Sequence, residues 1–175
     1  SLTNIGFTVP LKNKEAKKFF TEVCAEFRPG EVVAVLGPSG CGKSTLLDAI
    51  SGRITSRGSG TFLGTIKFNE KSSQGPDGLR HFVKRYVSYV PQHDALMGSL
   101  TVAETLGFSA AFYSAAPSIE RQRDIDVVVD QMGLRSCANT RVGNLFFKGL
   151  SGGQRTRLSI GIELLAKSPV ILLDE

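Results

Sequence analysis

Alternating apolar and polar positions over residues 1–28 predict antiparallel strands, with a polar connection between them at residues 10–18. A β-branched run at residues 31–36 follows a turn signal and is typical of a buried parallel strand. Residues 44–51 have the pattern of a helix, and residues 61–68 that of another strand. The first part of the chain is therefore predicted to combine a small antiparallel sheet with one strand and one helix of an α/β core.

Helical spacing dominates the second part of the chain. Apolar residues recur at helical intervals over residues 101–131 and again over residues 151–166. Apolar runs at residues 85–90 and 170–173 flank these helices and predict two more buried strands, the first of which ends at Pro91. The pattern as a whole predicts the α/β class, with a mixed or parallel sheet core, an N-terminal antiparallel β part and an inserted helical segment.

The composition is that of a globular chain. With 175 residues, 41% of them hydrophobic and 21% charged, the chain can form one domain with a sizeable core. The formal net charge of +5 suits a polyphosphate ligand or an anionic membrane surface, and it suits an ordinary solvated basic surface equally well. No basic run is flanked by aromatic residues, so no nucleic-acid partner is expected.

The cysteines and the chain ends give weaker information. Cys24, Cys41 and Cys137 are widely spaced and form no metal-ligand pattern with the histidines, which indicates a reduced, intracellular protein. No stretch of the chain approaches the roughly 18 apolar residues of a membrane span, and no signal peptide is present. Ser1 is not an initiator residue and Glu175 follows an apolar run, so both ends are expected to be cut from a longer protein.

A glycine-rich segment between the first two core elements matches the phosphate-binding pattern Gly-x4-Gly-Lys-Ser. Glycines let the backbone curl so that its N–H groups point at phosphate oxygens, and the helix start adds partial positive charge there. Lys43 is expected to reach the β- and γ-phosphates, and Ser44 to ligate Mg²⁺. The predicted nucleotide-binding residues are Gly37, Pro38, Ser39, Gly40, Cys41, Gly42, Lys43, Ser44 and Thr45.

The magnesium ion of such a site needs an aspartate at the end of a neighbouring strand. Asp174 follows the apolar run at residues 170–173 and meets this need, while Glu175 beside it is placed to polarise a water molecule for attack on the γ-phosphorus. An apolar run that ends in two acids indicates by itself only an exposed strand end. In combination with the phosphate loop, the two acids indicate a Mg²⁺-phosphate centre.

A second glycine-containing helix start lies at residues 150–154, where a serine cap and two glycines expose N–H donors to an anion. In this order with the phosphate loop and Asp174, the segment resembles the signature of ATP-binding-cassette (ABC) ATPases. The resemblance implies that the signature closes over the γ-phosphate held by the phosphate loop of a second cassette. The residues that it assigns to this contact are Ser151, Gly152, Gly153 and Gln154.

The resemblance covers nearly the whole chain and assigns further roles. Residues 89–92 resemble the segment whose glutamine, here Gln92, senses Mg²⁺ and the γ-phosphate while the residues after it face a transport partner. The expected catalytic residues are Glu175, Lys43 and Gln92. The expected metal ligands are Ser44, Gln92 and Asp174.

By the same resemblance, residues 1–98 and 167–175 form a RecA-like core with its antiparallel β part, and residues 99–166 form the helical subdomain that carries the signature helix. Residues 37–48 and 97–106 further resemble the G, or white-type, subfamily of ABC transporters. Such proteins work as dimers, carry the cassette ahead of their transmembrane helices, and export lipids or amphipathic compounds. The resemblance thus implies Mg·ATP as cofactor. It implies a second cassette and a transmembrane domain of the same full-length chain as partners, with the cassette on the cytoplasmic side of a membrane.

Two other functions remain open beside ATP hydrolysis coupled to transport. A soluble ABC ATPase of DNA repair or translation needs long coiled coils or a tandem second cassette, and neither is present in this sequence. A regulatory cassette that binds ATP without turnover has no need of Glu175 or of an intact signature, and both are present here.

The sequence departs from the family pattern at two points. The aromatic residue that stacks on adenine corresponds to Val9, with Phe7 two residues earlier on the same face, so adenine selectivity is expected to be weak. The switch histidine expected after Asp174 is missing, since His81 and His93 both precede it. The 175-residue chain is therefore expected to hydrolyse ATP poorly by itself.

Overall fold

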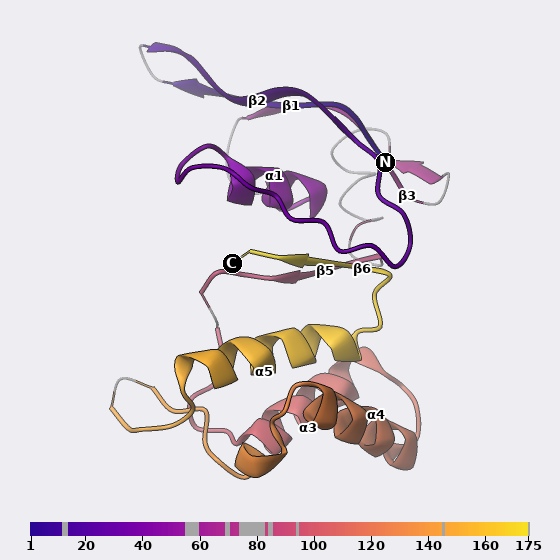
Figure 1. Ribbon diagram of the computed structural model, residues 1–175, viewed down its shortest axis with the longest axis vertical. Coiled ribbons are helices and arrows are strands. Elements are labelled where there is room, and N and C mark those ends of the chain that lie inside the picture. Colours follow the sequence, from indigo (N-terminus) through magenta and orange to yellow (C-terminus); the bar gives the residue numbers. More distant parts are fainter. Residues whose placement is uncertain are drawn as a thin grey trace. The chain divides into compact units, whose positions relative to one another are not determined.

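The computed structural model describes residues 1–11, 14–54, 60–68, 71–73, 83, 86–93, 95–144 and 146–174. The chain divides into two units, Ser1–Val87 and Ser88–Glu175, and each is described by itself. Figure 1 shows the strands and the helix of the first unit and the helices of the second.

The first unit is built on a four-stranded sheet. In spatial order its strands are β2 (Lys14–Ala25), β1 (Leu2–Leu11), β3 (Thr61–Phe68) and β4 (Lys71–Ser73). Every neighbouring pair is antiparallel, which confirms the antiparallel β part predicted from the alternation of the sequence. β3 has the predicted bounds.

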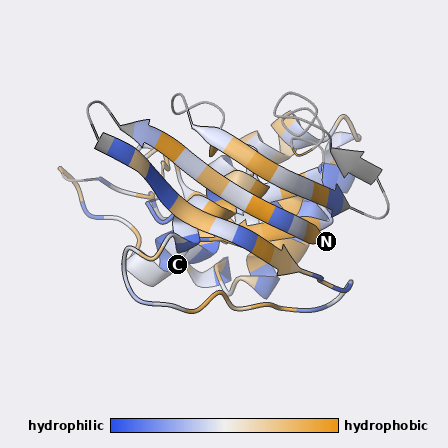
Figure 2. Cartoon of the chain, turned by 90° about the horizontal axis from the view of Figure 1, so that it is seen from above, coloured by the Kyte–Doolittle hydropathy of each residue, from blue (hydrophilic) through white to orange (hydrophobic). Residues whose placement is uncertain are grey.

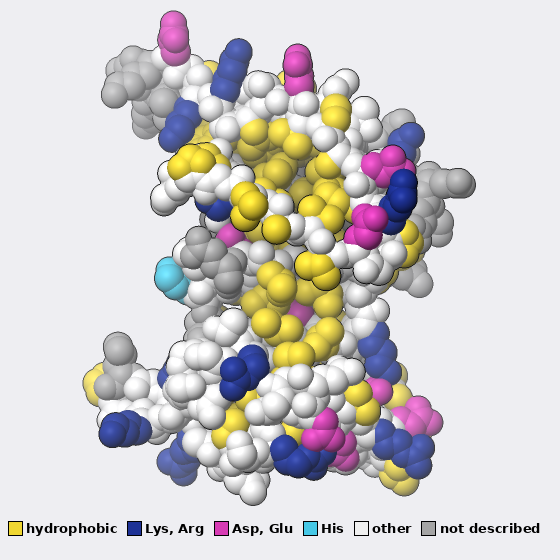
Figure 3. All heavy atoms as spheres, viewed as in Figure 1, with side chains coloured by type: hydrophobic (Ala, Val, Ile, Leu, Met, Phe, Trp, Pro, Cys, Tyr) yellow, Lys and Arg dark blue, Asp and Glu magenta, His cyan; other side chains and the backbone are white. Residues whose placement is uncertain are grey.

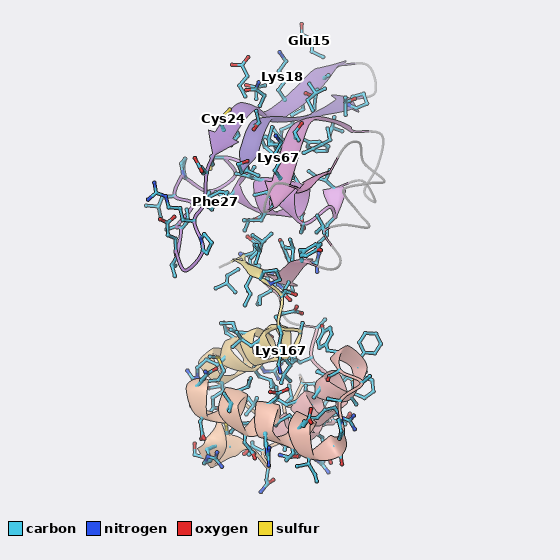
Figure 4. All side chains as sticks on the ribbon, turned by 90° about the vertical axis from the view of Figure 1, so that its right-hand side faces the viewer. Glu15, Lys18, Cys24, Phe27, Lys67 and Lys167 are labelled. Carbon is cyan, nitrogen blue, oxygen red and sulfur yellow. The ribbon has the colours of Figure 1, made fainter. Side chains whose placement is uncertain are left out.

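β1 and β2 are longer than predicted. The polar connection expected at residues 10–18 is mostly strand, because β1 continues to Leu11 and β2 begins at Lys14. Glu15 and Lys18 are exposed and project from this end of β2 (Figure 4). Main-chain hydrogen bonds hold a hairpin together whether or not its side chains are apolar, so the hydropathy pattern missed this extension.

The core of the first unit lies between the sheet and α1 (Lys43–Ile50), a helix that the sequence predicted. One cluster of buried residues there consists of Phe7 of β1, Ala49 of α1 and Ile54. The partly buried residues that pack against them are Val9, Phe19, Phe20 and Phe62. Figure 2 shows apolar and polar positions alternating along the strands, as expected of a sheet with one face on a core.

Residues 31–36 contradict the prediction of a buried strand. The segment is irregular, with Val32 100% exposed and Leu36 89% exposed. Figure 3 shows apolar side chains on the visible surface of this unit. A strand needs a hydrogen-bonded neighbour, and within the described part of the first unit the sheet pairs only β1 to β4. β-branched composition indicates a preference for sheet, but it does not supply the partner strand.

The second unit combines three helices with a two-stranded sheet. The helices are α3 (Val102–Tyr113), α4 (Ser118–Gln131) and α5 (Gly152–Leu165), and a 3-10 turn, η2 (Arg135–Cys137), follows α4. The strands are β5 (Val87–Val90) and β6 (Val170–Leu173). The sequence predicted the helical stretch that contains α3 and α4, the helix α5 and both strands, whereas η2 was not predicted. The predicted helical stretch 101–131 is divided at residues 114–117, because Pro117 starts α4 as its N-cap.

The helices of the second unit share one apolar core. Its buried residues are Val102, Leu106, Ala110, Ile125, Val128, Val129, Leu134, Cys137, Val142, Leu150, Leu158 and Leu165. Gly161 lets α5 approach its neighbours, since a Cβ there would come within 3.0 Å of Val128 on α4. Lys167, labelled in Figure 4, donates to Asp124 of α4 at 2.7 Å. These contacts hold α5, whose first residues belong to the predicted signature.

Candidate functional site

The predicted phosphate loop, residues 37–45, runs into the first turn of α1. Lys43 is the first residue of α1, and its N-cap Gly42 has φ 103° and ψ 14°, in the left-handed region. Gly40 also has a positive φ of 79°. Glycine adopts these angles without the strain that a Cβ adds. The loop therefore turns at its glycines and leads into a helix N-terminus, as the sequence pattern predicts.

The start of α1 favours an anion. No side chain caps it. The first N–H groups of a helix have no intrahelical acceptor, and the helix dipole adds partial positive charge at this end. An external acceptor such as a phosphate oxygen satisfies both features.

The Lys43 ammonium group lies over the loop. Its Nζ donates to the carbonyl oxygens of Gly37 at 2.9 Å and Pro38 at 3.0 Å. Cys41 lies on the same loop, where a Cβ on Gly37 would come within 2.8 Å of its Sγ. Hydrogen bonds between two charged partners are stronger than those from an ammonium to a neutral carbonyl. Phosphate oxygens in the loop would therefore displace the two carbonyls from Lys43.

The start of α5 is closed by a capping box. The N-cap Ser151 accepts from the N–H of Gln154 at 3.3 Å, and the side chain of Gln154 accepts from the N–H of Ser151 at 2.9 Å. These bonds engage the backbone donors of both residues. Gly152 and Gly153, the first two residues of α5, have no intrahelical acceptor for their N–H groups. Within the predicted signature, these two glycines are the donors that the helix geometry directs at an anion.

Asp174 lies at the end of the two-stranded sheet. Its N–H donates to the Val90 carbonyl oxygen at 3.0 Å, so the carboxyl ends of β5 and β6 lie together. Gln92 follows β5 by two residues and is exposed at this end. The structure thus brings two of the predicted metal ligands, Gln92 and Asp174, to one end of one sheet.

Tyr89 supports the predicted metal ligand Asp174, a role that the sequence analysis did not predict. This buried residue of β5 is 6% exposed, and its hydroxyl donates to Oδ2 of Asp174 at 3.1 Å. The hydrogen bond orients the carboxylate from inside the unit. The available signal was a tyrosine within a strand that was predicted to be buried, because a buried phenol needs a partner for its hydroxyl.

The remaining predicted residues divide between the units. Glu175 lies outside the described residues. Ser44 belongs to the first unit, whereas Gln92 and Asp174 belong to the second. A hydroxyl, an amide oxygen and a carboxylate are hard oxygen donors of the kind that Mg²⁺ takes. Among the described residues, no group of three His, Cys, Asp or Glu side chains could hold a metal ion.

The adenine-stacking position is occupied by core residues. Phe7 is buried, and its ring centroid lies 5.7 Å from that of Phe19 and 6.4 Å from that of Phe20. Val9 packs against the same cluster. Phe7 therefore serves the core of the first unit and leaves no free ring face for a base.

The chain is similar to known proteins over most of its length. The model of the ABC transporter family matches residues 20–175. The human ATP-binding cassette sub-family G member 8 is 41% identical over 150 residues, which are 85% of this chain and 21% of that protein. ABC transporter G family member 1 of Arabidopsis thaliana is 38% identical over 163 residues, covering 92% of this chain and 21% of the relative.

A solved structure has the same fold. It is described as the dimeric structure of a post-hydrolysis state of the ATP-binding cassette MJ0796 bound to ADP and Pi. It matches 99% of this chain and 72% of its own with a TM-score of 0.75 and 26% identity.

The fold and the two glycine-led helix starts define a P-loop ATPase of the ABC type. The chain belongs to the ABC transporter family, and its curated relatives include G-family members. It spans about a fifth of the length of these relatives. In the part of the chain that the structure describes, no helix has the length and apolar character needed to cross a bilayer.

Proposed function

We propose that this chain is the ATP-hydrolysing cassette of a G-family exporter, in which ATP joins two cassettes and hydrolysis separates them. The observation that carries the proposal is the pair of helix starts. One is uncapped and follows a phosphate loop with its own lysine, and the other presents two glycine N–H groups beside a capping box. When two copies face each other, the phosphate loop of one copy and the glycine N–H groups of the other can bind the same phosphate. The dimeric relative bound to ADP and Pi supports this arrangement.

Catalysis in this proposal rests on positioning and charge. Lys43 binds the β- and γ-phosphates once it leaves the loop carbonyls. Ser44, Gln92 and Asp174 are the residues that would hold Mg²⁺, and the ion would neutralise phosphate charge. Gly152 and Gly153 of the second cassette donate to the γ-phosphate, and Glu175 accepts a proton from the attacking water.

A Glu175→Gln variant of the full-length protein tests this function. The amide cannot take the proton, so we expect turnover to fall at least 100-fold while an ATP-bound cassette dimer accumulates. Size-exclusion chromatography with labelled ATP measures the dimer, and phosphate release measures turnover. Glu120→Gln, at an exposed position of α4, is the control. Unchanged turnover in Glu175→Gln would favour a regulatory cassette without hydrolysis.

The isolated 175-residue chain is expected to bind ATP but to turn it over slowly. The signature must come from a second cassette, so turnover depends on the encounter of two chains. Phosphate release measured against protein concentration should rise more steeply than linearly. A rate per chain that stays constant on dilution would contradict the composite site.

Weak nucleotide selectivity follows from the buried position of Phe7. Base stacking on an aromatic ring contributes about 1–3 kcal/mol to binding, and this cassette lacks that contribution from Phe7. We expect GTP to compete with ATP within about tenfold. Displacement of a fluorescent ATP analogue by each nucleotide measures the ratio, and a preference for ATP above about 100-fold would refute the expectation.

We also propose a transmembrane domain as the partner and lipids or amphipathic compounds as cargo, with the cassette facing the cytoplasm. The relatives' names as transporters support this. The surface of α3 supports it too, because this helix exposes Phe108 (64%) and Phe112 (81%) one helical turn apart.

Phe112→Asp in the full-length protein should uncouple lipid-stimulated ATP hydrolysis while nucleotide affinity stays unchanged. Ile119→Asp, on the exposed side of α4, is the control. Full stimulation in Phe112→Asp would remove α3 from the coupling surface.

A further inference from the structure

The turn that leads into α5 is tightly built. Leu150 donates to the Val142 carbonyl oxygen at 3.0 Å, so the turn closes on itself. A separate segment anchors its first half: Val142 donates to Leu100 at 2.8 Å, and Gly143 donates to Gly98 at 2.9 Å. The start of the signature helix therefore stands on a turn whose position is set by backbone hydrogen bonds.

Three glycines let the backbone segments of this turn touch. A Cβ on Gly98 would lie 2.6 Å from the Gly143 carbonyl oxygen, and a Cβ on Gly143 would lie 2.6 Å from the Gly149 nitrogen. A Cβ on Gly149 would meet the backbone of Val142 and Gly143 well inside van der Waals contact. With no side chains between these segments, their backbones lie in direct contact, while the side chains of Val142 and Leu150 pack in the core of the unit. A polar connection also links the turn to the start of α5.

Arg155 supplies that connection. It lies one turn into α5, is partly buried, and donates through one guanidinium nitrogen to the carbonyl oxygens of Val142 at 3.0 Å and Gly143 at 2.6 Å. A cation in the first turn of a helix opposes the helix dipole. Two carbonyl acceptors compensate for that position. The arginine therefore joins the helix to the turn beneath it.

We propose that Arg155 is a positioning residue of the signature. It ties α5 to its leading turn, so that the N–H groups of Gly152 and Gly153 keep the direction needed to meet the γ-phosphate held by a second cassette. This rests on the proposed function. The role is one of positioning, because Nη2 of Arg155 donates to the turn.

Arg155→Lys and Arg155→Met in the full-length protein test the proposal. Lysine keeps the charge, but its side chain is one bond shorter, so its ammonium group does not take the place of the Nη2 atom that donates to both carbonyls. We expect the affinity of the phosphate loop for Mg·ATP to stay within twofold in both variants. The ATP concentration that half-saturates cassette association should rise at least tenfold in both. Fluorescent-nucleotide titration measures the affinity, and energy transfer between labelled cassettes measures association.

Two further variants separate the possible failures. Gly153→Asp places a carboxylate against the expected phosphate and should abolish association; if it does not, the proposed function is wrong. Arg123→Met, at an exposed position of α4, should match the wild type. If Gly153→Asp abolishes association while both Arg155 variants associate normally, the role of Arg155 is refuted. Normal association of Arg155→Lys alone would assign the effect to charge and overturn the positioning role. Should the methionine variant not fold, as judged by thermal unfolding, the lysine variant decides alone.

Discussion

The phosphate loop and the signature are both glycine-containing segments that lead into a helix, yet the structure builds them differently. The signature helix is closed by a reciprocal capping box and rests on buried Leu150 and Leu158. The phosphate loop has no side-chain cap, is largely exposed, and follows an irregular segment with Val32 fully in solvent. The signature is held in place by the residues around it, whereas the phosphate loop is bridged by its own Lys43, which donates to two loop carbonyls.

Under the proposed function, this difference gives the cassette two ways to bind one phosphate group. The signature offers backbone donors whose direction is set before any ligand is present. The phosphate loop relies on the Lys43 side chain, which donates to two loop carbonyls and would exchange them for phosphate oxygens. Substitutions that disturb packing should therefore affect the signature most, and substitutions that remove charge should affect the phosphate loop most.

The largest effect is expected from Gly149→Ala, because the new methyl group would collide with the backbone of Val142. We expect the free energy of unfolding to fall by about 3 kcal/mol or more. Gly40→Ala in the phosphate loop meets open space and costs only the left-handed conformation, about 1 kcal/mol. Urea unfolding measures both. Gly107→Ala, in an open position of α3, should stabilise and serves as the control. Equal losses at Gly149 and Gly40 would erase the contrast.

Lys43→Met should weaken Mg·ATP binding about 100-fold, close to 2.7 kcal/mol, since it removes the cation of the phosphate loop. Stability should change little, because the ammonium group bonds only to exposed loop carbonyls. Nucleotide titration and thermal unfolding measure the two quantities. Lys18→Met, at the exposed end of β2, should leave both unchanged. A Lys43→Met protein that binds Mg·ATP normally would show that backbone donors suffice in this loop as well.

Tyr89→Phe should raise the Mg²⁺ concentration that half-saturates nucleotide binding by about threefold to tenfold, the equivalent of one lost hydrogen bond of about 1 kcal/mol. The phenyl ring keeps its buried place, so the change isolates the hydroxyl that Asp174 accepts. Titration of nucleotide binding with Mg²⁺ measures it. Tyr113→Phe on α3 is the control. An unchanged Mg²⁺ dependence, together with a strong effect of Asp174→Asn, would limit Tyr89 to the core.

The smallest effect concerns the two capping boxes. That of α3 uses the carboxylate of Glu104, whereas that of α5 uses the neutral amide of Gln154. Hydrogen bonds from the backbone and the side chain of Thr101 lower the pKa of Glu104. A lowered folded-state pKa contributes stability above the unfolded-state pKa, and this stability is lost as the pH falls through the folded-state value. The stability contributed by the capping box of α5 should not change with pH over this range, because the amide of Gln154 carries no charge.

Thermal unfolding of the wild type and of Glu104→Gln, compared from pH 7 downward, measures this contribution. The difference between the two proteins should be small at neutral pH and should shrink in acid, as Glu104 takes up its proton. Glu120→Gln, at the exposed start of α4 and outside both capping boxes, is the control. A difference between wild type and Glu104→Gln that grows in acid would have the wrong sign for this capping box.

Sequence reasoning was most successful where local interactions decide. The bounds of β3, the start of α1 and the serine cap of α5 follow from alternation, from a glycine pattern and from a cap that bonds within four residues. The hairpin of β1 and β2 exceeded its predicted length, because main-chain pairing continues through polar residues. Residues 31–36 failed as a predicted strand, because no described strand of their unit pairs with them.

By itself, the sequence determined the chemistry of this protein: a lysine and a serine at a glycine loop, a capped glycine pair, and an aspartate after an apolar run. Only the tertiary structure decided which groups support them. Tyr89 reaches Asp174 across 85 residues of chain, and Arg155 reaches back to the carbonyls of Val142 and Gly143. A motif can be recognised in the sequence because its residues are close together along the chain. The residues that orient it come from other segments, which only the folded structure brings near, so no local sequence pattern reveals them.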